Sequence, residues 1–287
     1  MKEHTKAYVA GLVDAEGTLS IELASRYDCV TSYARLSISN TERRIHKYLV
    51  QMFGGQFSLV NRDKAGRPKY WKPEYRWTPT GMKHSSWFLS QIHPYLRIKR
   101  KEANLLLEYY SMNGIQSPAY NRRRKELIQR SNELKDRSVE TDIQKVFWKN
   151  NLINAYFAGL CDGDGCVSIK RQPLNSYFVY SGLLNLVNTH GPLIHAAEAT
   201  YGGRSRLRTE QTDRRMPSYE WATRNKQLIK LILLKWLPYL VIKREQAKIL
   251  LQFVQHERIV KSDVDPNRHD FREALYQKMY KLNHPEH

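Results

Sequence analysis

The sequence predicts an α+β protein that contains two copies of one domain, each an antiparallel sheet with helices on one face. The first observation is a long internal repeat: YVAGLVDAEGTLSIE, from Tyr8, returns as YFAGLCDGDGCVSIK, from Tyr156. The second is that the apolar pattern within each copy changes from the period of a helix to the alternation of half-buried strands and back. The third is the size of a copy, roughly 110 residues, which excludes solenoids with periods of 20–50 residues.

The repeat keeps its order along the chain. Asp14 corresponds to Asp162, and the FGG that ends at Gly55 corresponds to the YGG that ends at Gly203, each pair 148 positions apart. Further on, HPYLRIKRKEA and LPYLVIKREQA correspond at a separation of 144 positions. We therefore expect a difference of four residues in the hairpin that lies between these segments.

Each copy is expected to run helix, two strands, helix, two strands and then further helices. In the first copy the motif helix is followed by the alternating segments TLSIEL and YARLSIS, the helical pattern IHKYLVQMF, the alternating segment QFSLVN and the helical patterns SSWFLSQI and KEANLLLEYY. The expected domains are residues 1–110 and 151–287. Residues 111–150 should connect them, with a short helix and the basic run NRRRK from Asn121. The tail from Asn267 predicts one more amphipathic helix.

Composition narrows the class of protein. Hydrophobic residues make up 41% and charged residues 26% of the chain, which is ordinary for a globular protein. Lys and Arg total 47 against 28 Asp and Glu, a net charge of +19. Such a charge attracts polyanions, so nucleic acid is the first expected partner and an anionic membrane surface the second. No apolar stretch is long enough to span a membrane, and the N-terminus lacks the pattern of a signal peptide.

Cysteine usage and short motifs exclude further chemistry. Cys29, Cys161 and Cys166 form no CxxC pair, so neither a disulfide framework nor a Cys-rich zinc site is expected. The chain has no HExxH, no Walker lysine and no complete dinucleotide fingerprint, so no nucleotide cofactor is expected. These features predict an intracellular protein of a prokaryotic cytoplasm or an organelle, not a secreted one.

The two motif helices carry small residues one turn apart, at Gly11 and Ala15 and again at Gly159 and Gly163. Small residues at this spacing let two helices approach closely, so we expect the copies to join through these helices about a pseudo-twofold axis. Glu16 and Asp164 would then lie close together at the helix C-termini. Two like charges about 5 Å apart repel by roughly 3 kcal/mol at an effective dielectric of about 20, which divalent cations would relieve.

Oxygen ligands without Cys or His favour Mg²⁺, with Mn²⁺ as a substitute. Glu16 and Asp164 are the expected metal ligands, and the sequence assigns no main-chain ligand beside them. The alternative is that DxxG merely ends each helix, with its glycine as the C-cap. For Asp14 and Asp162 we expect structural roles: capping, orienting the acids or pinning the helix pair.

AGLVDAEG and AGLCDGDG resemble the two signature motifs of the single-chain LAGLIDADG homing endonucleases, and the PYLxIKR segments and Asn-Thr turns extend the resemblance over nearly the whole chain. The sequence departs from the commonest pattern at Glu16, Cys161 and Gly163. The resemblance implies two saddle-shaped antiparallel sheets backed by helices. It also implies a monomer that needs no protein partner and that hydrolyses both strands of a long, non-palindromic double-stranded DNA target. Cleavage across the minor groove would leave short 3′ overhangs.

The same resemblance assigns catalytic roles to Glu16 and Asp164. It places Lys99 and Lys243 where the family keeps a basic residue near the water network, with solvated or phosphate-contacting lysines as the alternative. It places Asn40 and Asn188 where a polar residue orders active-site water, with plain turn asparagines as the alternative.

Strand alternation predicts a polar sheet face that can meet base edges in a major groove. Its expected DNA-contacting residues are Ser20, Glu22, Arg35, Ser37, Gln56, Ser58 and Arg76 in the first copy and Ser168, Lys170, Arg204, Arg206, Arg208 and Glu220 in the second. The alternative is an ordinary solvated face. The aromatic residues Tyr75, Trp77, Tyr219 and Trp221 are expected under the helices, as core packing and not as platforms for base stacking.

Two other functions are compatible with this pattern. One is an RNA maturase of the same fold that binds intron RNA, for which NRRRK would serve as a contact. The other is a non-catalytic transcription regulator that binds DNA. Retention of both Glu16 and Asp164 argues against the regulator. The chain lacks the splicing residues of an intein host, so we expect a free-standing or intron-encoded protein.

Overall fold

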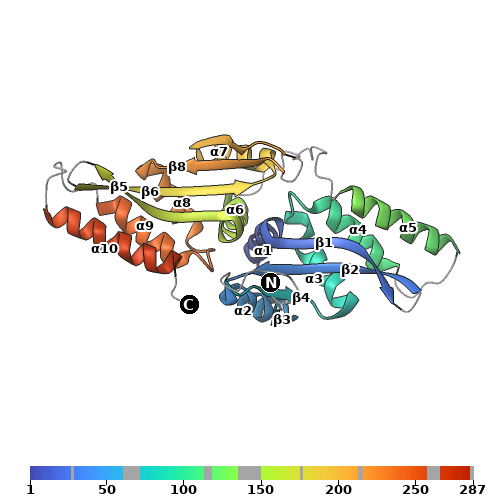
Figure 1. The fold of residues 1–287 in the computed structure, drawn as a ribbon. Helices are drawn as coiled ribbons and strands as arrows, with labels where there is room; N and C mark the ends of the chain where they lie inside the picture. Colours follow the sequence, from blue (N-terminus) through green and yellow to red (C-terminus); the bar gives the residue numbers. More distant parts are fainter. Residues whose placement is uncertain are drawn as a thin grey trace. The chain divides into compact units, whose positions relative to one another are not determined.

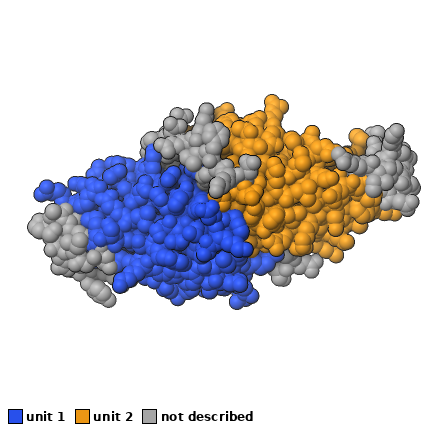
Figure 2. Space-filling view, turned by 180° about the vertical axis from the view of Figure 1, so that it is seen from behind, with its two compact units in different colours: residues 1–147 blue, residues 148–287 orange. Residues whose placement is uncertain are grey.

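The computed structural model describes residues 1–26, 29–60, 72–112, 118–134, 150–174, 177–212, 216–256 and 266–284. The chain divides into two compact units, residues 1–147 and 148–287 (Figure 2). Each unit contains a four-stranded sheet, with strand order β1-β2-β4-β3 in the first and β5-β6-β8-β7 in the second. All described strand pairs are antiparallel. The predicted α+β repeat is confirmed.

The elements follow the predicted order in both units (Figure 1). Those of the first unit are α1 (Glu3–Glu16), β1 (Gly17–Arg26), β2 (Cys29–Asn40), α2 (Arg43–Phe53), β3 (Gln56–Leu59), β4 (Tyr75–Thr78), α3 (Gly81–Ile92), the 3₁₀ turn η1 (His93–Tyr95), α4 (Arg100–Ser111) and α5 (Pro118–Glu133). Those of the second unit are α6 (Asn150–Asp164), β5 (Gly165–Leu174), β6 (Tyr177–Asn188), α7 (Gly191–Tyr201), β7 (Arg204–Thr209), β8 (Ser218–Thr223), α8 (Lys226–Trp236), α9 (Arg244–His256) and α10 (Pro266–Asn283). The expected tail helix is α10.

One tryptophan anchors the apolar face of each sheet. Trp77 of β4 and Trp221 of β8 are fully buried, and their indole N–H groups donate to the carbonyls of Gly54 (2.9 Å) and Gly202 (2.7 Å). Trp77 packs against Phe88 of α3, and Trp221 packs against aromatic residues of α7 and α8. These tryptophans therefore belong to the core, as the alternation predicts.

The double glycine before β3 and β7 serves the same anchor. Gly55 and Gly203 have φ values of 82° and 91°, which residues with a side chain rarely adopt. A Cβ at either position would also lie 2.9 Å from the indole nitrogen of the tryptophan. The FGG and YGG segments recur because the turn and the close approach to the indole both require glycine.

Strand register locates the length difference between the copies. Ser58 of β3 pairs with Arg76 of β4, and Arg206 of β7 pairs with Glu220 of β8. The first members of these pairs are separated by 148 positions and the second members by 144. The expected difference of four residues therefore lies between the two strands of this hairpin, and that prediction is confirmed.

Helix α5 lies within the expected connecting segment of residues 111–150 and packs on the first unit. Ser131 accepts a hydrogen bond from the backbone N–H of Ile21 in β1 (2.9 Å). Arg124 donates to the Ser32 carbonyl and the Tyr109 hydroxyl. Within the described parts of the chain, no helix is both long and apolar enough to cross a membrane.

Candidate active site

Each motif acid is the last residue of its helix. Glu16 ends α1 and Asp164 ends α6, and a strand begins at the next residue, Gly17 or Gly165. A Cβ on Gly17 would lie 2.6 Å from the Val13 carbonyl oxygen, and one on Gly165 would lie 2.7 Å from that of Cys161. Gly17 has an extended backbone, with φ of −75°, so a side chain is excluded by the close contact and not by backbone strain. This tight turn from helix to strand fixes the place of each acid.

An asparagine at the end of the second strand holds each acid. The Asn40 side-chain amide donates to Glu16 Oε1 (2.9 Å), and the Asn188 amide donates to Asp164 Oδ2 (2.6 Å). The carbonyl oxygen of each asparagine side chain accepts a backbone N–H two residues further on, at 2.8 Å in both units. Each asparagine is therefore a turn residue, as the alternative expectation has it, and its amide also contacts the motif acid; the ordering of water stays a prediction.

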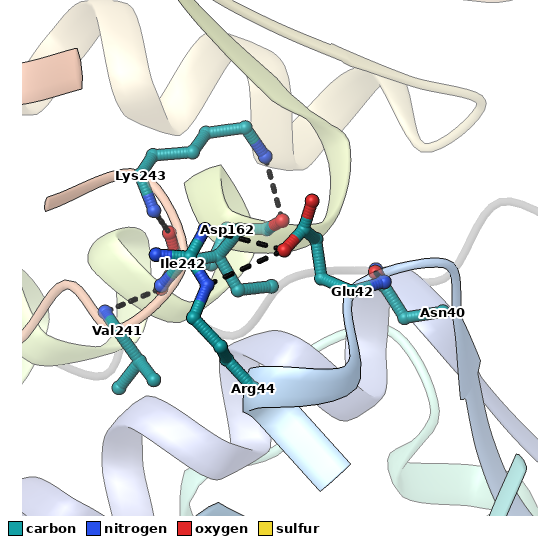
Figure 3. Close-up of polar contacts among 7 residues, drawn as sticks. All are labelled: Asn40, Glu42, Arg44, Asp162, Val241, Ile242 and Lys243. Atoms are coloured by element: carbon teal, nitrogen blue, oxygen red, sulfur yellow. Dashed lines mark hydrogen bonds and ion pairs between the residues drawn. The ribbon is translucent and has the colours of Figure 1, made fainter. Parts of the chain in front are cut away.

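The first aspartate of each motif caps a distant segment of its own unit. Asp162 is 1% exposed and accepts three backbone N–H groups, from Val241 (2.7 Å), Ile242 (3.0 Å) and Lys243 (2.8 Å) (Figure 3). Asp14 accepts the corresponding three, from residues 97, 98 and 99, at 2.7, 3.2 and 2.9 Å. These contacts tie the PYLxIKR segment to the end of the motif helix.

The two lysines of that segment complete the junction. Lys99 Nζ donates to the carbonyls of Val13 and Asp14, each at 2.8 Å. Lys243 Nζ donates in the same way to the carbonyls of Cys161 (2.8 Å) and Asp162 (2.6 Å). Lys99 is only 4% exposed, so the expectation of a solvated side chain is wrong there. A cation at these carbonyls, which lie two and three residues before the acid, stabilises the negative end of the helix dipole.

The donor chemistry of the acids suits a hard divalent cation. The hydrogen-bonded carboxylates of Glu16 and Asp164 offer oxygen, the donor that Mg²⁺ and Ca²⁺ prefer. Among the described residues, no group of three or more His, Cys, Asp and Glu side chains could hold a metal ion. A Mg²⁺ ion held by a single carboxylate usually keeps several water ligands.

Polar side chains on the first sheet form a network around Glu22. The Glu22 carboxylate accepts hydrogen bonds from Ser20 (2.9 Å), Tyr33 (2.7 Å) and Arg35 (3.3 Å). Burial raises the pKa of Glu22, but these hydrogen bonds and the charge of Arg35 outweigh it, and the pKa is lowered overall. Gln56 and Ser58 are exposed.

The second sheet presents more exposed cations. Lys170, Arg204, Arg206 and Arg208 are exposed, and Arg206 pairs with Glu220 (2.6 Å). Burial raises the pKa of Glu220, but hydrogen bonds from Asn185 and Arg206 outweigh it and lower the pKa overall. Asn185 was absent from the expected set, although it stands out as the polar residue within the apolar run LLNLV.

Three serines expected on the DNA-contacting face do not reach solvent. Ser20, Ser37 and Ser168 are only 4%, 2% and 5% exposed. A hydroxyl that solvent does not reach is not positioned for a base edge. Of the residues expected to contact DNA, these three serines are therefore among the least accessible.

No protein-family model and no curated protein matches the sequence. Solved structures match the fold. The LAGLIDADG homing endonuclease I-SmaMI, bound to cleaved DNA, aligns over 96% of this chain and 97% of its own with a TM-score of 0.70 and 16% identity. I-GzeII, in complex with its DNA target, aligns over 98% of both chains with a TM-score of 0.72 and 15% identity. I-LtrWI, bound to target DNA, aligns over 99% of this chain and 98% of its own, with a TM-score of 0.69 and 12% identity.

These alignments define the class of fold. The chain has the two-domain α+β fold of the single-chain LAGLIDADG homing endonucleases, over nearly its whole length.

Proposed function

We propose that the protein is a site-specific, metal-dependent DNA endonuclease of the LAGLIDADG homing type. The observation that carries this proposal is the duplicated junction: acid, asparagine, capping aspartate and lysine recur with the same hydrogen bonds in both units. A helix end that needed only a cap would not require the second acid and its asparagine. The fold supports the proposal, because I-SmaMI and I-GzeII share it and are bound to DNA.

In this proposal each unit contributes one metal-binding acid. Glu16 and Asp164 would bind Mg²⁺, or Mn²⁺ in its place, and the bound cation would polarise the scissile phosphate and lower the pKa of water. I-SmaMI has been solved on uncleaved DNA in the presence of calcium ions, which is consistent with divalent-cation binding here. Asn40 and Asn188 hold the carboxylates in one orientation, and Lys99 and Lys243 hold the helix ends.

The proposed substrate is a long, non-palindromic double-stranded DNA site, cut on both strands by a monomer to leave short 3′ overhangs. The net charge of +19 supports a polyanionic substrate. The differing sheet faces of the two units support an asymmetric site, since exposed arginines dominate β7 whereas β3 carries Gln56 and Ser58.

The structure gives less support to an RNA maturase built on the NRRRK run. Arg123 pairs with Glu108 (2.6 Å) and Glu126 (2.8 Å), and Arg124 packs over the Tyr109 ring. Two of the three arginines therefore serve the packing of α5. RNA binding is an outcome to be tested and not the favoured function.

The proposal is tested with supercoiled plasmid that carries the protein's own coding locus without the coding segment. In Mg²⁺ we expect linear product, and none after EDTA is added. A second plasmid, with the locus interrupted by the coding segment, should stay supercoiled. Nicking of one strand only, or equal cutting of both plasmids, would overturn the proposal.

A further inference from the structure

Three side chains from three strands form a chain of contacts on the polar face of the second sheet. Arg206 of β7 donates to Glu220 Oε2 of β8 through Nε (3.0 Å) and Nη2 (2.6 Å). Asn185 of β6 donates to the other oxygen, Glu220 Oε1 (2.8 Å). The arginine side chain is 69% exposed and the glutamate side chain 11%. A nearly buried carboxylate thus holds a guanidinium that faces solvent.

The contact with Glu220 occupies one edge of the Arg206 guanidinium and leaves a second edge available to another acceptor. Arginine has five N–H donors in a planar fork. Glu220 takes the side edge, made by Nε and Nη2. The end edge remains, with one N–H of Nη1 and one of Nη2 pointing outward in parallel. Two parallel donors match O6 and N7 of guanine in a major groove.

The charge of the pair favours a base over a phosphate. The negative charge of Glu220 offsets the positive charge of Arg206, so the pair attracts a phosphate less than a lone arginine would, and the carboxylate itself repels a phosphate. The acceptors of guanine carry no net charge, so the end edge keeps its hydrogen bonds to them. Arg208, whose charge also lowers the pKa of Glu220, forms no such hydrogen-bonded ion pair with any residue that the structure describes, and suits a phosphate better.

The first unit lacks this arrangement at the equivalent place. Strand register puts Arg76 where the second unit has Glu220, and Ser58 where it has Arg206. Arg76 donates to Ser39 (3.3 Å). The position on β4 and β8 therefore carries opposite charges in the two units, and the strand pair carries +1 in the first unit and no net charge in the second.

We propose that Glu220, held by Asn185, is a positioning residue for sequence readout that directs the end edge of Arg206 toward a guanine in the half-site under the second unit. This inference rests on the proposed DNA function and adds the residue that sets specificity at one position. Glu220 contacts no base in this role; it acts through Arg206.

The test is a base-by-base profile of binding. The full-length protein is used to select duplexes from a pool of double-stranded oligonucleotides of random sequence. Every single-base change is then measured for the wild type, Glu220→Gln, Arg206→Lys and the double variant. Glu210→Gln is the matched control, because it removes the same charge from an exposed position just after β7.

We expect the wild type to prefer guanine at one position by about 5- to 150-fold, the range of a bidentate contact. Glu220→Gln should lower that preference at least about threefold at that position and leave the others unchanged. Arg206→Lys keeps the charge but lacks the parallel donors, so it should lose the same preference. The double variant should match Arg206→Lys alone, because both changes act on one contact.

The outcomes separate this inference from the proposed function. A wild type that selects no duplex sequence would overturn the proposed function. A wild type with a clear profile that Glu220→Gln leaves unchanged would overturn the inference alone. A guanine preference that Arg206→Lys leaves unchanged would show that the parallel donors of Arg206 read no base, as for a phosphate contact that lysine can keep, and would also overturn it. Because Arg206 is exposed, this variant tests the inference even where Glu220→Gln does not fold.

Discussion

Replacing Asp162 by asparagine tests whether the first acid of the motif is structural. The carboxylate accepts three N–H groups through both of its oxygens: Oδ2 from Val241 and Ile242, and Oδ1 from Lys243. Asparagine offers one oxygen only. In its better orientation it keeps the first two bonds and turns its NH₂ group toward the Lys243 N–H, so two donors face each other at a buried site.

The magnitude follows from these contacts. A hydrogen bond to a charged group contributes about 1.5–3 kcal/mol, and a buried unpaired donor costs about 1–3 kcal/mol. Since one bond is lost and two are weakened, we expect Asp162→Asn to lower the free energy of unfolding by about 2–4 kcal/mol. Urea unfolding followed by far-ultraviolet circular dichroism measures it. The control is Glu210→Gln, which also neutralises a carboxylate, at an exposed site, and which should cost under about 0.5 kcal/mol.

The same variant distinguishes a structural role of Asp162 from a catalytic one. Asp162→Asn should lose DNA cleavage only in proportion to the folded fraction. A variant that unfolds at the wild-type urea midpoint and yet does not cleave DNA would refute the structural role.

Three further predictions concern the lysines, salt and pH. Lys99→Met and Lys243→Met keep the apolar stem of the side chain but remove the donors to the helix carbonyls, so each should lower the free energy of unfolding in urea by about 1–3 kcal/mol, with the larger loss at the more buried Lys99. Each should also slow DNA cleavage more than it weakens DNA binding, and equal proportional losses of rate and affinity would contradict this. DNA affinity should fall with a log–log salt slope near −9 for about ten phosphate contacts, whereas a slope near −2 in a fluorescence anisotropy titration would indicate a small patch. Burial lowers the pKa of His46 below its ordinary 6.5, so the unfolded chain binds more protons than the folded protein below about pH 6.5, and the free energy of unfolding should fall there. In His46→Ile, which introduces the residue found at the equivalent position of the second unit, the free energy of unfolding should fall less between pH 7 and pH 5.

Much of the fold could be predicted because the repeat samples the same architecture twice. A pattern present in both copies, such as the glycine pair before β3 and β7, marks what the fold requires. Glu16 and Asp164 were found in the same way, and the structure places each at the end of its helix. Asn40 and Asn188 were expected only from the family resemblance, and each contacts its acid.

The remaining features depend on contacts between segments far apart in the sequence. Alternation gives the face of a side chain but not the length of its neighbours, so the burial of Ser37 and Ser168 could not be predicted. The direction of Lys99 depends on how the residues before α4 dock onto α1. The pairing of Arg206 with Glu220 requires the strand register, which a hairpin of unknown length does not fix.

The central claim is that Glu16 and Asp164 act in DNA cleavage, and the neutral variants Glu16→Gln and Asp164→Asn test it most directly. Each keeps the size of its side chain and removes one negative charge beside the phosphates. Cleavage of both strands in Mg²⁺ should be abolished, while affinity for the same duplex, measured by anisotropy in Ca²⁺, should stay equal or increase. If either variant cuts both strands at the wild-type rate, the assignment of the two acids is wrong.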